Sequence, residues 1–176
     1  MRNPRKYYRH IDELTKILQY EHGTLSITRK ILNKYKHNFN WDNICRNQHL
    51  TEAMIEDFQH YMNWDDICQY QTLSENFIRN HQDLVNWGYI TKRQFLSTKF
   101  IREFQDYVDW NIITYRYPLS DDFVDEFHKK IDWTTLICER VHMIDFNWVE
   151  ELKKRYNVVP VHVPGLAYCW KEKGDL

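Results

Sequence analysis

Large apolar side chains return along the chain at a constant interval, and tryptophan marks that interval most clearly. Five of the seven tryptophans follow one another at intervals of 23 residues: Trp41, Trp64, Trp87, Trp110 and Trp133. An aliphatic residue follows each of them after three positions: Ile44, Ile67, Ile90, Ile113 and Leu136. The unit reads L-[ST]-x-x-F-I-x-x-F-x-x-x-V-[ND]-W-x-x-I-x-x-x-Q-x. Periodicity of this length is typical of proteins built from stacked structural repeats.

The spacing within one unit predicts two short helices. Over 97–108 the apolar residues Phe100, Ile101, Phe104, Tyr107 and Val108 fall on one helical face and do not alternate as in a strand. We expect a first helix of about eleven residues and a second of about eight, the usual size of short amphipathic helices. Serine and aspartate precede them and would cap their free N–H groups. The expected caps are Ser97 for the first helix and Asp109 for a second helix that starts at Trp110.

Neither helix of a unit can bury its apolar face alone, so the units are expected to stack side by side. The fold class predicted is all-α, an α-solenoid of short helical hairpins with 23-residue repeats. Residues 1–26 would form a basic arm and an N-terminal cap helix, and 27–142 the helical-repeat array. Residues 143–156 would form a C-terminal cap helix, and 157–176, with two prolines and several β-branched residues, an extended tail.

Charge and cysteine content narrow the classes of function. The formal net charge of −1 gives no general case for nucleic-acid binding. No apolar run reaches the roughly 20 residues that span a bilayer, and the start lacks a signal peptide, so we expect an intracellular, reducing location and no secretion. The four cysteines, Cys45, Cys68, Cys138 and Cys169, are expected to be free thiols. Cys45 and Cys68 each follow a repeat tryptophan by four residues and are expected to fill equivalent packing positions. No Cys/His spacing indicates a metal site, and no cofactor is expected.

Catalysis and base-by-base RNA reading both lack the pattern they need. The sequence has no phosphate-binding glycine loop and no zinc-protease motif, and most of its serines are predicted helix caps. RNA recognition by repeats needs a basic face that recurs at 23 residues. One equivalent position instead carries mixed charges, with Glu56, Arg79, Arg102 and Asp125. The protein is therefore predicted to be no enzyme and to bind protein, with RNA a less favoured alternative.

Tyrosine and arginine on the second helices are the candidate partner-binding residues. They lie outside the repeated apolar positions: Tyr70, Tyr89, Arg93, Tyr115, Arg116 and Tyr117. Both residue types are enriched at interface hot spots. The alternative is that these tyrosines pack between hairpins and expose only their hydroxyl groups.

The repeat also resembles a known kind of sequence. The copies "NWDDICQYQTLSENFI" and "DWNIITYRYPLSDDFV" are similar to tandem repeats in uncharacterised proteins of large nucleocytoplasmic DNA viruses, over about residues 27–146. Tyr117 and Arg140 depart from the pattern, since they stand where the repeat has glutamine. The resemblance implies a viral helical-repeat protein and supplies no catalytic residue. It favours a minor capsid-associated component of the virion, with capsid proteins as partners; the alternative is an adaptor in the host cytoplasm that binds a host protein.

Overall fold

The computed structural model describes residues 28–139, 146–162 and 168–173. They are mostly helical, with a series of helices of about seven residues each, so the helical class predicted from the sequence is confirmed. The chain divides into two units, unit 1 up to Phe104 and unit 2 from Gln105, and each is described by itself. The predicted basic arm and cap helix at 1–26 lie outside the described residues.

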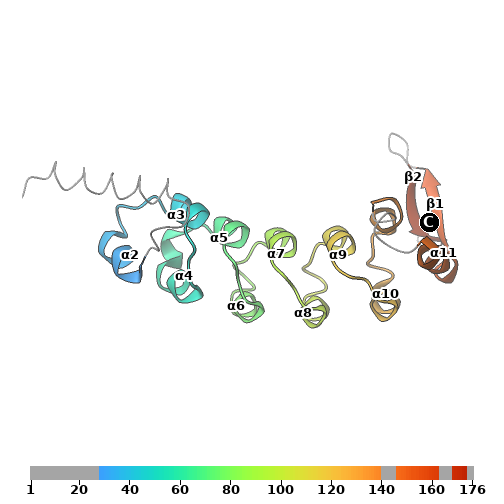
Figure 1. Ribbon diagram of the computed structural model, residues 1–176, viewed down its shortest axis with the longest axis horizontal. Helices are drawn as coiled ribbons and strands as arrows, with labels where there is room; N and C mark the ends of the chain where they lie inside the picture. Colours follow the sequence, from blue (N-terminus) through green and yellow to red (C-terminus); the bar gives the residue numbers. More distant parts are fainter. Residues whose placement is uncertain (1–27, 140–145, 163–167, 174–176) are drawn as a thin grey trace, which may run out of the picture. The chain divides into compact units, whose positions relative to one another are not determined.

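Unit 1 contains helical hairpins in the order that the repeat predicts. In Figure 1 its odd-numbered helices from α3 to α7 line one side and its even-numbered helices from α4 to α8 the other. We call α2, α4, α6 and α8 first helices and α3, α5 and α7 second helices. Their bounds are α2 Arg29–Tyr35, α3 Trp41–Asn47, α4 Glu52–Phe58 with a 3₁₀ turn Gln59–Tyr61, α5 Trp64–Tyr70, α6 Glu75–Asn80, α7 Trp87–Arg93 and α8 Thr98–Glu103. Second helix α5 packs against both α3 and α7.

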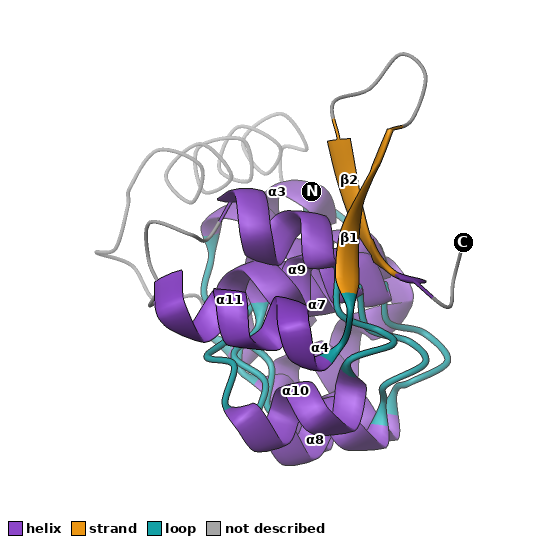
Figure 2. Ribbon diagram, turned by 90° about the vertical axis from the view of Figure 1, so that its right-hand side faces the viewer, coloured by secondary structure: helices purple, strands orange, loops and turns teal. Residues whose placement is uncertain are grey.

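Unit 2 begins with the same hairpin pattern and ends differently. Its elements are α9 Trp110–Arg116, α10 Asp121–Phe127, a π-helical turn Thr135–Glu139, α11 Phe146–Arg155, β1 Val158–His162 and β2 Tyr168–Glu172. Helix α11 falls within the range predicted for a C-terminal cap helix. Residues predicted as an extended tail instead form an antiparallel hairpin, with Pro160 opposite Trp170. Figure 2 shows this hairpin beside α11.

Side-chain caps explain where the helices begin. The Ser97 hydroxyl accepts a hydrogen bond from the Phe100 N–H at 3.1 Å. The Asp109 carboxylate accepts from the Asn111 N–H at 3.0 Å, and the helix it caps starts at Trp110. Such caps satisfy N–H groups that have no partner inside the helix. Both predicted caps are therefore confirmed.

The first helices are shorter than predicted, because the chain leaves the helix to form the turn. Helix α6 has six residues, and His81 after it has left the α-helical region, with φ −121° and ψ 24°. The Trp87 indole N–H then donates to the Gln82 carbonyl at 3.2 Å. The tryptophan side chain thus satisfies a carbonyl of the turn, which a longer helix would have used internally.

Tryptophan and phenylalanine join successive hairpins through ring contacts. In unit 1 the Trp87 ring lies 4.9 Å from the Phe104 ring and 6.3 Å from the Phe100 ring, between centroids. In unit 2 Trp110 packs in the same way on Phe127, at 5.0 Å. Aromatic pairs at these separations gain energy beyond the area they bury. The repeat motif therefore builds the contact between one hairpin and the next.

Trp133, the last tryptophan of the 23-residue series, packs against a different kind of neighbour. The Trp133 ring lies 5.5 Å from the ring of Tyr156, just after α11, and its buried indole N–H has no hydrogen-bond partner among the described residues. Trp133 and Leu152 belong to a core on which Trp170 of β2 also packs. The Trp170 N–H donates to the Thr134 hydroxyl at 2.9 Å. Helix α11 and the β-hairpin thus cover the end of the repeated pattern within unit 2.

Candidate interaction surface

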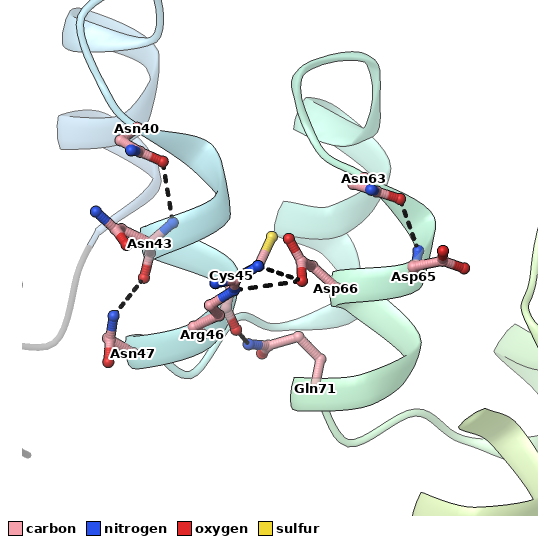
Figure 3. Close-up of polar contacts among 9 residues, drawn as sticks. All are labelled: Asn40, Asn43, Cys45, Arg46, Asn47, Asn63, Asp65, Asp66 and Gln71. Carbon is pink, nitrogen blue, oxygen red and sulfur yellow. Dashed lines mark hydrogen bonds and ion pairs between the residues drawn. The ribbon is translucent and has the colours of Figure 1, made fainter.

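A buried glutamine ties each second helix of unit 1 to the one before it. The Gln71 side chain, only 4% exposed, donates to the carbonyls of Cys45 at 2.6 Å and Gln48 at 2.8 Å. Its amide oxygen accepts from the Leu50 N–H at 2.8 Å. Figure 3 shows this side chain reaching from α5 to the end of α3. Gln94 repeats the arrangement one hairpin later, with the carbonyls of Cys68 and Gln71 and the N–H of Leu73.

The hydrogen bonds of this glutamine explain why the residue recurs at one position of the repeat in unit 1. One primary amide supplies two donors and an acceptor, which matches the two carbonyls and the N–H that the chain leaves at this turn. Backbone groups buried without partners would cost free energy, so the amide is a structural requirement. The amides of Gln71 and Gln94 therefore join neighbouring second helices of unit 1.

Arg46 of α3 forms a polar contact with Asp66 and Tyr70 of α5. Asp66 is 6% exposed, and the Arg46 guanidinium donates to its carboxylate at 3.2 Å (Figure 3). The same guanidinium lies over the Tyr70 ring, 5.6 Å from the centroid. The Asp66 carboxylate raises the pKa of Arg46 further above its usual range, through the hydrogen bond and the charge. One side of the Tyr70 ring is therefore already in contact with the protein, and 43% of the residue is exposed.

The other predicted partner-binding residues of unit 1 lie on α7. Tyr89 is half-buried, and Arg93, four residues later on the same helical face, is exposed. The described residues provide no hydrogen-bond or ion-pair partner for the Arg93 side chain. Because α7 packs against α5, the structure brings Tyr89 and Arg93 onto the helix next to the one that carries Tyr70.

Unit 2 holds the remaining predicted residues at the end of α9. Tyr115 is 46% exposed and Arg116 is exposed. The Arg116 guanidinium lies over the half-buried Tyr117 ring at 5.9 Å from its centroid. The four predicted tyrosines occupy four different positions of the repeat, so they do not form a repeated row. Their burial differs accordingly: Tyr70 and Tyr115 are exposed, and Tyr89 and Tyr117 are partly packed.

Among the described residues Phe95 is the most exposed large apolar side chain, and it is not one of the predicted partner-binding residues. It follows α7 by two residues and is 92% exposed. Its neighbours in the chain, Gln94 and Leu96, are both buried, so the backbone at Phe95 is held between two anchored residues. A rigidly presented aromatic side chain is a common hot-spot residue. Tyr61, Leu84 and Tyr107 form a second exposed set at equivalent positions of the turns between first and second helices.

Charged residues on the first helices satisfy one another across neighbouring hairpins. Glu56 lies 3.2 Å from the His81 ring nitrogen Nε2, and the Arg79 guanidinium donates to both Glu103 carboxylate oxygens at 2.9 Å. In unit 2 the Arg155 guanidinium donates to Asp125 at 3.1 Å. Local pairing thus accounts for the mixed charges at three residues of this position, Glu56, Arg79 and Asp125, since each has a different partner.

The two described cysteine side chains are buried free thiols, Cys45 and Cys68. Burial raises the pKa of Cys45 to about 12 and that of Cys68 to about 11. The Cys68 sulfur accepts from the Asn86 N–H at 3.3 Å, and at the equivalent position of unit 2 the Thr114 hydroxyl accepts from the Asp132 N–H at 3.1 Å. Packing and hydrogen bonding therefore explain both cysteines, as predicted from their equivalent positions.

Two searches of the described residues bear on other classes of function. No group of three or more histidine, cysteine or acidic side chains in the described ranges is arranged to hold a metal ion. None of the helices described has both the length and the apolar character needed to cross a membrane.

Comparison with known proteins identified no relative of this chain. No protein family, no curated protein and no solved structure matches the chain. Function therefore has to be inferred from the repeat and its surfaces alone.

Proposed function

We propose that the protein is a non-catalytic α-solenoid that acts as a scaffold for protein–protein interaction. The observation that carries this proposal is the exposed aromatic side chains on regularly joined hairpins, above all Phe95 at 92% exposure. Tyr70 and Phe95 lie at the C-terminal ends of α5 and α7, two second helices that pack together. Extended surfaces of stacked hairpins are the usual binding sites of helical-repeat proteins.

Large aromatic residues together with arginine favour protein as the partner. Tyr70, Phe95 and Arg93 combine apolar area with a charged group, the composition of interface hot spots. Base-by-base reading of RNA is less favoured, because the positions that would face a nucleic acid carry charges of both signs.

The surface is tested by partner capture with two matched double variants. Tyr70→Ser with Phe95→Ser removes the proposed anchors, and we expect binding of the captured partner to weaken about 30-fold or more, as for hot-spot residues. Leu84→Ser with Tyr107→Ser is the control, since both residues are more than half exposed but lie at the other end of the second helices, at 51% and 58%. Equal capture by both variants would contradict the proposed surface.

Within this scaffold class we propose a virion component, associated with capsid proteins, because of the resemblance to repeats of large DNA viruses. The rival role is an adaptor in the host cytoplasm that binds a host protein through the same surface. Mass spectrometry of purified particles separates the two. Stoichiometric amounts in particles support the virion role, and detection in infected-cell lysate alone would contradict it.

A further inference from the structure

A pocket of about 550 Å³ opens between α2 and the end of α4 in unit 1. It has one aromatic wall and one basic wall. Phe58 and Tyr61 line the side of α4 and the turn that follows it. The side of α2 and the residue after it contributes Arg29, Lys30, Asn33 and Lys36, and Asp57 completes the lining.

The aromatic wall is held in place from behind. The Trp41 ring stacks on the Phe58 ring and on the Tyr61 ring, each at 5.4 Å between centroids and nearly parallel at 27° and 20°. The Trp41 indole N–H is itself fixed to the Lys36 carbonyl at 2.8 Å. Phe58 is 4% exposed and Tyr61 is 37% exposed, so Tyr61 offers the accessible ring. A preformed ring surface costs little ordering entropy when a flat ligand stacks on it.

The basic wall keeps positive charge that the described part of the chain does not neutralise. Arg29 is paired with Asp57. The side chains of Lys30 and Lys36 form no hydrogen bond or ion pair with any of the described residues. Two ammonium groups next to an asparagine amide provide donors for an anionic oxygen, and phosphate is the anion that such groups commonly bind.

The later repeats lack this combination at the equivalent positions. Between α4 and α6, Ala53 stands for Lys30, Glu56 for Asn33 and Gln59 for Lys36. Leu84 takes the place of Tyr61. Tyr107 repeats the exposed ring and Lys99 repeats one cation, but at different hairpins. The combination of both cations with an accessible ring is therefore found at the first described hairpin and is not a consequence of the repeat.

We propose that this pocket binds a phosphate group joined to a flat aromatic base, that is, a nucleotide. The base stacks on Tyr61, and the phosphate lies against Lys30 and Lys36. Stacking on an aromatic residue with a cationic contact to the backbone is the general chemistry of nucleotide and single-strand binding. The pocket shares no residue with the proposed protein-binding surface at Tyr70, Arg93 and Phe95, so the two proposals are independent.

Isothermal titration calorimetry on the full chain tests the site with adenosine monophosphate, adenosine and inorganic phosphate. We expect adenosine and phosphate each to bind at least about tenfold more weakly than the monophosphate, because each lacks one of the two contacts. Lys30→Gln with Lys36→Gln should weaken binding about tenfold, and Tyr61→Leu should do the same by removing the stacking ring. Lys99→Gln is the matched control, since Lys99 occupies the position of Lys30 in a later repeat and should leave affinity unchanged.

Three results would overturn the proposal. They are no heat with millimolar adenosine monophosphate, phosphate binding as tightly as the nucleotide, and equal loss with Lys99→Gln. Far-ultraviolet circular dichroism of each variant establishes that it is folded; all changed side chains lie on or near the surface. A 5′-phosphorylated oligoadenylate then distinguishes the source of the nucleotide. Binding at least as tight as the monophosphate assigns the end of a nucleic-acid strand, and clearly weaker binding assigns a free nucleotide.

Discussion

The two sides of the hairpins in unit 1 are joined to their neighbours by different chemistry. On the second-helix side a buried amide, Gln71 or Gln94, makes three hydrogen bonds to backbone groups at the junction with the preceding repeat, two of them to carbonyls of that repeat. On the first-helix side, partly exposed carboxylates accept hydrogen bonds from the backbone of the next repeat. Glu52 accepts from the Ser74 N–H at 2.6 Å and Glu75 accepts from the Ser97 N–H at 2.5 Å. The contact on the second-helix side is buried and neutral, whereas the contact on the first-helix side is exposed to solvent and charged.

This contrast indicates which positions of a repeat can change without loss of the fold. A buried amide must satisfy three fixed backbone groups, so its position admits few replacements. A surface charge is screened by water and can be exchanged when its partner changes. Arg79 pairs with Glu103 and Arg29 pairs with Asp57. The two arginines accordingly occupy different positions of the repeat. The first-helix side is therefore variable within one chain, and the glutamine position within unit 1 is constant.

The largest loss of stability is expected when Trp87 is removed, because this second-helix residue packs on the first helix of the next hairpin. Trp87→Ala deletes the ring that packs on Phe100 and Phe104, and it also frees the Gln82 carbonyl. We expect the free energy of unfolding to fall by about 3 kcal/mol, the lower end for large aromatic residues, because Trp87 is only partly buried. Urea denaturation followed by circular dichroism measures it. A loss below about 0.5 kcal/mol would mean that the tryptophans act at the surface instead.

A loss almost as large is expected on the second-helix side. Gln94→Ala leaves the Leu73 N–H and the carbonyls of Cys68 and Gln71 without their partner. We expect a loss of about 2–3 kcal/mol, because these groups are buried and lose their hydrogen bonds together. Gln82→Ala is the control, since the Gln82 side chain is exposed and only its backbone carbonyl is used. Equal effects of the two variants would contradict a special role for the buried amide.

A much smaller loss is expected on the first-helix side. Arg79→Ala removes the two hydrogen bonds to Glu103, whose side chain is 42% exposed. The loss should be about 1 kcal/mol or less and should shrink in high salt, as for other surface ion pairs. Thermal unfolding at two salt concentrations checks both statements. A salt-independent loss as large as that of Gln94→Ala would remove the distinction between the two sides.

The smallest change at neutral pH is expected for Cys68→Thr, which copies the residue found at this position in α7 and α9. We expect stability to change by about 1 kcal/mol or less, because the threonine hydroxyl can accept from the Asn86 N–H as Thr114 does from Asp132.

The same substitution should change the pH dependence of stability. Burial raises the pKa of Cys68 in the folded state to about 11, so the unfolded thiol ionises first as pH rises. The wild type should therefore lose stability above about pH 9, near the ordinary cysteine pKa, and Cys68→Thr should lose less. Denaturation curves from pH 7 to pH 10.5 compare the two. Identical curves would contradict the buried position of the thiol.

Local features of this fold could be predicted from the sequence, and contacts between distant residues could not. Ser97 and Asp109 were predictable as caps, because a cap bonds within three residues of itself. The role of Gln71 was not, because its partners lie 21 to 26 residues earlier. The pairing of Pro160 with Trp170 is likewise a contact that no periodic pattern reveals. The exposure of Phe95 could not be predicted either, because this residue falls at a variable position of the repeat between two residues that tertiary packing buries.

Native-state hydrogen exchange of two adjacent amides tests the contrast between the two sides most directly. The Leu73 N–H is held by the buried Gln94 amide at 3.0 Å, and the Ser74 N–H is held by the carboxylate of Glu52 at an exposed position. Local opening should break the solvent-exposed contact on the first-helix side first. We therefore predict that the Leu73 amide exchanges at least about 100-fold more slowly than the Ser74 amide, after correction for intrinsic rates. Gln94→Ala should remove most of that difference. Equal protection of the two amides in the wild type would contradict the account.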